Sequence, residues 1–74
     1  MARELAIHGD PHEALRAIQA LEQQYPDHPL VHRSYGIVYD RLGDTKRSLA
    51  AFTRFFELAP DHPDVPRIKR RHGL

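Results

Sequence analysis

Apolar residues recur every three or four positions in three stretches of the chain, and each stretch is framed by residues that start or stop helices. In the first stretch, Asp10 precedes Pro11, an order typical of a helix start. Pro26 ends this helix, because a proline disfavours helical geometry in the residue before it. The apolar face of this predicted helix consists of Ala14, Ile18, Leu21 and Tyr25, widened by Leu15 and Ala17.

The second stretch predicts a helix that starts at Pro29 and ends at Gly43, where a glycine suits the left-handed residue that often closes a helix. One face of this helix carries Val31, Tyr35, Val38 and Leu42, with Tyr39 beside them.

The third stretch predicts a helix capped by Asp44 and closed by Pro60. Its inner line is Leu49, Phe52 and Phe56, flanked by Ala51, Phe55 and Leu58.

Shorter helices are predicted at the two ends of the chain. Residues 2–8 have helix-forming composition and stop at Gly9. Residues 64–72 predict another short helix, with Asp64 as its cap and a start delayed by Pro66. Connections of two to six residues require neighbouring helices to run antiparallel. No stretch alternates as a strand does, so the sequence predicts an all-α fold.

The chain also repeats itself at a spacing of 34 residues. Gly9-Asp10 recurs as Gly43-Asp44, and the turn sequence Pro26-Asp27-His28-Pro29 recurs as Pro60-Asp61-His62-Pro63. These turn residues coincide with matching apolar positions, so each repeat is one helical hairpin.

A hairpin repeated every 34 residues resembles the tetratricopeptide repeat (TPR) family. The matching positions are Gly36, Tyr39, the Gly43-Asp44 turn, Phe52 and the closing Pro60. The resemblance implies one domain over residues 1–74, an α-solenoid fragment of antiparallel helix-turn-helix repeats. Residues 1–28 form a partial repeat, residues 29–62 a full repeat, and residues 63–74 a C-terminal capping helix or tail.

Four positions depart from the family pattern: His32, Tyr35, Ser48 and Phe55. Phe55 stands where a small alanine normally permits close packing. Because Phe56 follows directly, the pair indicates either wider helix spacing or an apolar surface that meets another chain.

The resemblance implies a non-catalytic module for protein–protein contact, with the first helix of each hairpin lining a concave face. In this sequence the implied partner-binding residues are Leu30, Arg33, Ile37, Asp40, Arg41, Arg67 and Arg71, flanked by Arg3 and Ile7. Arginines suit a peptide with an acidic side chain or terminal carboxylate, although they also occur on ordinary solvated helix faces. The asparagine-based carboxylate clamp of the family is not supported, because the chain contains no asparagine.

Self-association is the alternative function, because so few repeats bury a small core and arrays usually need about three. The candidate residues are Tyr35, Phe55, Phe56 and Leu58. Each of them could equally fill the core of its own chain.

Composition limits the other classes of function. The chain has a net charge of +1 and no cysteine, and no apolar run long enough to span a membrane. No secretory signal is recognisable, which favours a cytoplasmic protein. Residues 65–74 carry four basic side chains and no acid, but no interleaved aromatic residue, so we expect a solvated helix rather than nucleic-acid binding.

The candidate reactive groups do not form a catalytic or metal-binding motif. None of the serines or threonines lies in a nucleophile-elbow pattern, and no phosphate-binding loop is present. Two histidine pairs are four residues apart, His8 with His12 and His28 with His32, but turn residues interrupt a helix within the first pair and His28 lies at a helix boundary. The histidines in the turns, His28 and His62, are expected to cap or solvate helix ends. The sequence therefore predicts no enzyme activity, cofactor or metal.

Overall fold

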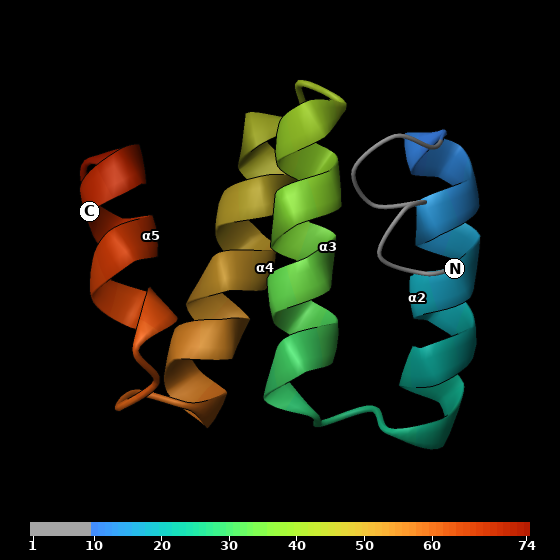
Figure 1. Ribbon diagram of the computed structural model, residues 1–74, viewed down its shortest axis with the longest axis horizontal. Helices are drawn as coiled ribbons and strands as arrows, with labels where there is room; N and C mark the ends of the chain where they lie inside the picture. Colours follow the sequence, from blue (N-terminus) through green and yellow to red (C-terminus); the bar gives the residue numbers. More distant parts are fainter. Residues whose placement is uncertain (1–9) are drawn as a thin grey trace.

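The computed structural model describes residues 10–74, which form a row of α-helices. These are α2 (Pro11–Gln24), α3 (Pro29–Arg41), α4 (Thr45–Leu58) and α5 (Asp64–His72). Neighbouring helices run antiparallel (Figure 1), and residues 10–74 include no strand. The predicted all-α fold is confirmed. The predicted helix over residues 2–8 lies outside the described residues. None of the helices in residues 10–74 has the length and apolar character needed to cross a membrane.

Local sequence signals place the helix ends. The Asp10 carboxylate accepts a hydrogen bond from the backbone N–H of His12 at 2.9 Å, and the Asp44 carboxylate accepts one from the N–H of Arg47 at 3.1 Å. Each carboxylate thereby satisfies an N–H that the first helical turn leaves unpaired. Gly43 has a φ of 78°, the left-handed conformation expected where a helix ends at glycine.

A histidine accepts a backbone N–H at the start of α3 and again at the start of α5. The Nδ1 atom of His28 accepts a hydrogen bond from the N–H of Leu30 at 3.2 Å. The Nδ1 atom of His62 accepts one from the N–H of Asp64 at 3.0 Å. The repeated Pro-Asp-His-Pro turn therefore performs the same task twice, as predicted.

The start of α5 differs from the prediction. The helix begins at Asp64 itself, and Pro63 occupies the capping position without a side-chain hydrogen bond. Pro66 does not delay the start, because the third helical position needs no N–H partner within the helix. The Asp64 side chain is therefore available to the neighbouring helix.

Two contacts set how the helices pack. Between α2 and α3, the buried cluster contains Ala14, Ile18, Val31 and Val38. Between α3 and α4, Gly36 lies so close to Phe52 that an added Cβ would stand 2.5 Å from the ring. The fully buried Ser48 hydroxyl donates to the Gly36 carbonyl at 2.7 Å. Gly36 thus acts as the small packing residue that the family resemblance implied.

Phe55 belongs to the core of the chain, which is the alternative that the sequence left open beside self-association. Its side chain has 0% exposure, and its ring meets the His62 ring edge-on at 5.1 Å between centroids. Phe56, predicted on the inner line, is only partly buried. Phe55 therefore fills the space where α4 leads into α5.

Candidate functional site

A groove runs between α3 and α5. It consists of two neighbouring cavities of about 300 Å³ and 190 Å³ that share Ile37, Ile68 and Arg71. The remaining lining residues are Arg33, Asp64 and Arg67 in the larger cavity and Asp40, Arg41, Phe52 and His72 in the smaller one. The turn after α4 brings α5 back antiparallel to α4. Both α3 and α5 therefore flank α4 and run in the same direction (Figure 1).

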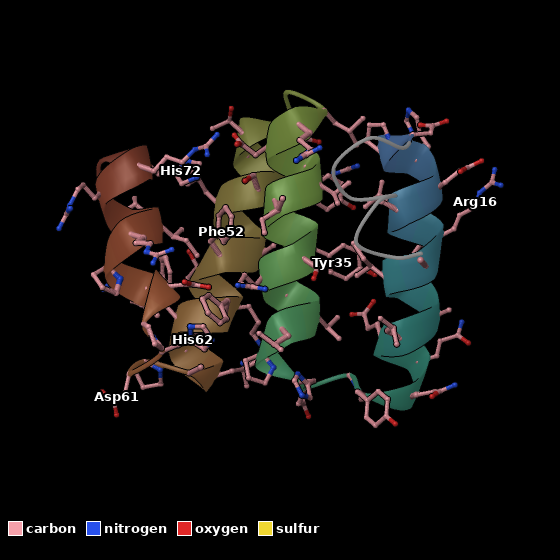
Figure 2. The ribbon with its side chains drawn as sticks, in the orientation of Figure 1. Arg16, Tyr35, Phe52, Asp61, His62 and His72 are labelled. Atoms are coloured by element: carbon pink, nitrogen blue, oxygen red, sulfur yellow. The ribbon has the colours of Figure 1, made fainter. Side chains whose placement is uncertain are left out.

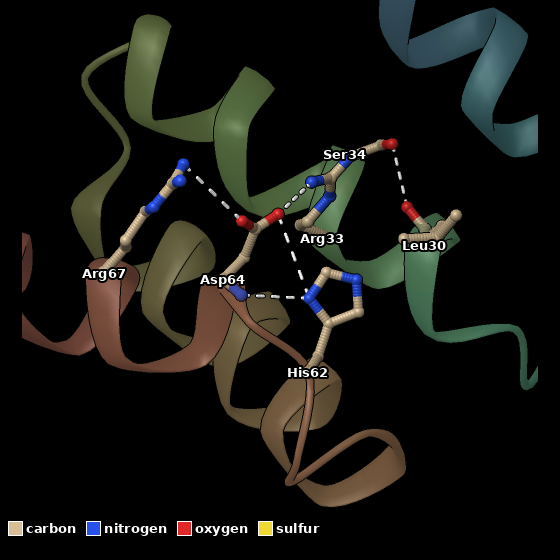
Figure 3. A network of polar contacts seen from close by, with 6 residues as sticks. All are labelled: Leu30, Arg33, Ser34, His62, Asp64 and Arg67. Carbon is tan, nitrogen blue, oxygen red and sulfur yellow. Dashed lines mark hydrogen bonds and ion pairs between the residues drawn. The ribbon is translucent and has the colours of Figure 1, made fainter.

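Asp64 is the centre of a polar network at one end of the groove (Figure 3). Its carboxylate accepts a hydrogen bond from Arg33 across the two helices. The Arg67 guanidinium lies 3.8 Å from the same carboxylate. At the other end, Arg71 donates to the Asp40 carboxylate at 3.0 Å. Two ion pairs between α3 and α5 therefore span the groove.

The arginines of the groove differ in how far they reach into solvent. The Arg33 side chain is 33% exposed, and its Nε atom is buried without a hydrogen-bond partner in the part of the chain that the structure describes. Arg67 and Arg71 are 81% and 74% exposed. Arg33 therefore joins the helices, whereas Arg67 and Arg71 present their charge at the surface.

The groove brings together most of the predicted partner-binding residues. Arg33, Ile37, Asp40, Arg41, Arg67 and Arg71 line it. Leu30 does not line it and instead borders a separate cavity between α2 and α3. Arg3 and Ile7 lie outside the described residues. Partner binding by these side chains stays a prediction.

Sequence reasoning missed four residues of the groove: Asp64 and Ile68 on α5, and Phe52 and His72 in the smaller cavity. The signal was present, because Asp64, Arg67, Ile68 and Arg71 follow the spacing of one helical face. Treating Asp64 only as a cap concealed this pattern.

The predicted self-association residues do not form one surface. Tyr35 points toward α2 (Figure 2), where its hydroxyl donates to Glu22 at 2.7 Å and its ring stacks on Tyr39. Phe56 faces the other way, with the Lys69 ammonium 5.3 Å from its ring centre. Leu58 is half-buried at the end of α4.

Burial and the neighbouring Glu22 carboxylate raise the pKa of the Tyr35 phenol. Both causes oppose ionisation, because a phenolate would lose solvation and would face a second negative charge. Tyr35 is therefore a neutral hydrogen-bond donor between α2 and α3.

The histidine rings are engaged in packing and in helix ends. The His32 Nε2 atom lies 2.9 Å from the Pro26 carbonyl, to which it donates. The His72 ring lies against Phe52, with 5.2 Å between ring centres. In residues 10–74, no three histidine, aspartate or glutamate side chains converge as metal ligands would.

Comparison with known proteins identifies the family. A family model described as tetratricopeptide repeat matches residues 5–72. No curated protein and no solved structure matches the chain. Repeats of this kind generally mediate protein–protein interactions and are typically non-catalytic. The match covers nearly the whole sequence and agrees with the hairpin repeat, the Gly36 packing contact and the glycine turn, and the chain therefore belongs to the tetratricopeptide repeat family.

Proposed function

We propose that the groove between α3 and α5 binds an extended peptide segment of a partner protein through an acidic side chain or a terminal carboxylate. The observation that carries this proposal is the convergence of arginines from both helices over an isoleucine floor. The segment would lie along the groove and contact α3 on one side and α5 on the other.

The charge of the groove favours an acidic ligand. Four arginines and two aspartates line the two cavities, which leaves an excess of positive charge. Because Arg67 and Arg71 are largely exposed, their guanidinium groups can each form paired hydrogen bonds with a carboxylate. The aspartates hold two of the arginines in place, and the excess positive charge discourages ligands that carry positive charge.

The floor of the groove favours a ligand that also carries an apolar side chain. Ile37 is 38% exposed, although it lies on a helix face that is otherwise partly covered. Ile68 lies beside it on α5, and both residues border both cavities. Covering Ile37 would remove apolar surface from water, which is favourable.

The experiment that tests this proposal is a binding screen against immobilised hexapeptides with acidic and apolar residues, each made with a free and an amidated C-terminus. The strongest ligand is then measured against Arg67→Glu, which should weaken binding by at least about tenfold, as expected when a charge-assisted contact becomes repulsive. Comparing the free and amidated forms shows whether a terminal carboxylate or a side chain is recognised.

Arg70→Glu is the matched control, because Arg70 is exposed on α5 but does not line the groove. It changes the net charge by the same amount and should leave affinity within about twofold at physiological salt, where distant charges are screened. Equal losses in the two variants, or no loss with Arg67→Glu, would contradict the proposal.

Self-association as the alternative function has less support. Phe55 is fully buried, and Tyr35 and Phe56 contact different helices. An interface built from the predicted residues would have to use Phe56 and Leu58.

A further inference from the structure

Helix α5 carries a titratable residue at a position that is apolar in the preceding repeat. A shift of 34 residues carries Val38 to His72 and Ile18 to Phe52. Val38 and Ile18 belong to the buried cluster between α2 and α3, and Val38 is 3% exposed. Between α4 and α5, the His72 ring lies against the Phe52 ring, with 5.2 Å between ring centres (Figure 2). A residue that can take up a proton therefore stands where the repeat otherwise places an apolar contact.

The His72 ring borders the groove as well as the core. It is partly buried and lines the smaller cavity together with Ile37 and Ile68. Phe52 holds the ring from the side of α4, and Phe52 is itself fixed by its close contact with Gly36. Because a contact between two rings satisfies no hydrogen bond of the imidazole, a nitrogen of this ring can serve a ligand in the groove.

Basic residues outnumber acidic ones beside His72. The charged residues that border the same cavity or share the last turn of α5 are Asp40, Arg41, Lys69, Arg70 and Arg71. The Asp40 carboxylate accepts a hydrogen bond from Arg71 at 3.0 Å, so it already has a cationic partner. Phe52, which α4 contributes to this cavity, is neutral. A protonated His72 is therefore best matched by a carboxylate from outside the chain.

We propose that His72 is a ligand-binding residue of the groove, and that its protonated ring donates a hydrogen bond to an acidic group of the bound peptide. This inference rests on the proposed function of the groove and adds that peptide binding takes up a proton. Histidine changes its charge between about pH 5 and 8, whereas a glutamate or aspartate of the peptide stays ionised above about pH 5. The affinity for an acidic peptide therefore rises as the pH falls from 8 to 6.

The direction of the pH effect separates ligand binding from a role in packing alone. If His72 served only to pack against Phe52, a charge at this partly buried position would loosen the last turn of α5. Acidification would then weaken peptide binding. A direct contact predicts the opposite, because proton uptake and peptide binding reinforce each other.

The experiment measures peptide binding to the full chain at pH 6 and at pH 8. The probes are the acidic hexapeptides of the binding screen, together with a form of the strongest one in which the acidic group is changed to an amide. Fluorescence anisotropy should show that the unchanged protein binds the acidic peptide about fivefold more tightly at pH 6 than at pH 8. The amide form should bind with the same affinity at both pH values.

Two variants of His72 separate its charge from its shape. In His72→Gln the side chain still forms hydrogen bonds but takes no charge, so the affinity should change by less than about twofold between the two pH values. His72→Arg carries a permanent charge, and at pH 8 it should bind the acidic peptide about as tightly as the unchanged protein does at pH 6. His12→Gln is the matched control, because His12 is exposed on α2 and does not line the groove. It should keep the full pH dependence.

The possible outcomes distinguish the role of His72 from the function of the groove. A pH dependence that is present in the unchanged protein and absent from His72→Gln would support the contact. Peptide binding without pH dependence, or with a dependence that persists in His72→Gln, would overturn the role of His72 and leave the groove as the binding site. Weaker binding at pH 6 would assign His72 to packing. Failure of every acidic hexapeptide to bind at either pH would overturn the proposed function, and this inference with it.

Discussion

At the residue scale, the Tyr35 side chain connects the helices of the two repeats, α2 and α3. Tyr35 of α3 reaches Glu22 of α2 with its hydroxyl and stacks on Tyr39 with its ring, at 6.0 Å between ring centres (Figure 2). Because burial and Glu22 raise the pKa of this phenol, the folded state holds the proton more tightly than the unfolded chain does. The residue therefore connects the protonation of one group to the packing of two helices.

This connection predicts a specific loss of stability in alkali. The unfolded tyrosine ionises near pH 10, so the contribution of Tyr35 is complete below that pH and is lost as the pH rises toward the raised folded pKa. The free energy of unfolding, measured with urea, should fall between pH 8 and pH 11. This fall should be smaller in Tyr35→Phe than in the unchanged protein. Tyr25→Phe, at an exposed tyrosine, should behave as the unchanged protein does. Identical losses in all three proteins would contradict this account.

At the scale of the element, α5 depends on polar side chains that reach across to α3. Asp64 joins the first turn of α5 to Arg33, and Arg71 joins its last turn to Asp40. Between them, the only buried residue of α5 is Val65. A helix of this length is marginal in isolation, so contacts with α3 and α4 determine whether it forms.

Asp64→Asn is therefore expected to loosen α5. Removing the carboxylate leaves Arg33 without its charged partner and weakens the first turn, at a cost of about 1 kcal/mol. Amide hydrogen exchange in residues 65–72 should become about fivefold faster, while exchange in α3 and α4 changes little. Asp61→Asn, in the exposed turn before α5, is the matched control. Unchanged exchange in Asp64→Asn would show that the ion pair does not hold the helix.

The elements also show why sequence reasoning succeeded in some places and failed in others. Asp10, Asp44 and Gly43 mark helix ends through contacts within a few residues, and such local contacts are readable in sequence. The role of the Asp64 side chain was not foreseen, because its partner Arg33 lies 31 residues away on another helix. Periodicity alone could not choose between Phe55 and Phe56, because both lie within the same apolar stripe and spacing does not reveal the contact of Phe55 with His62 in the turn after α4.

The 34-residue repeat predicts which residues of the candidate sites lie on the same helix face, but not which contacts they make. The register placed Arg33, Ile37, Arg67 and Arg71 on one face, and they line one groove. It could not reveal that Asp40 and Asp64 bind two of these arginines, nor that Leu30 borders a different cavity. Those facts depend on the distance and angle between helices, which spacing along the chain does not fix.

At the scale of the whole molecule, the question is whether the chain works alone or as an assembly. The prediction of self-association rests on the small core of so few repeats. If it is correct, the mass measured by light scattering should rise with protein concentration. Phe56→Glu should then lower it, because Phe56 is the partly exposed member of the phenylalanine pair. A mass equal to one chain at the highest attainable concentration would contradict self-association.

The histidines of the two turns accept backbone hydrogen bonds in the same way, and this has a chemical consequence that they share. An imidazole nitrogen that accepts a backbone N–H cannot carry a proton, so the neutral rings of His28 and His62 hold their proton on Nε2. Both turns lie at the same end of the row of helices (Figure 1). That end of the molecule therefore displays the same tautomer twice, once before α3 and once before α5.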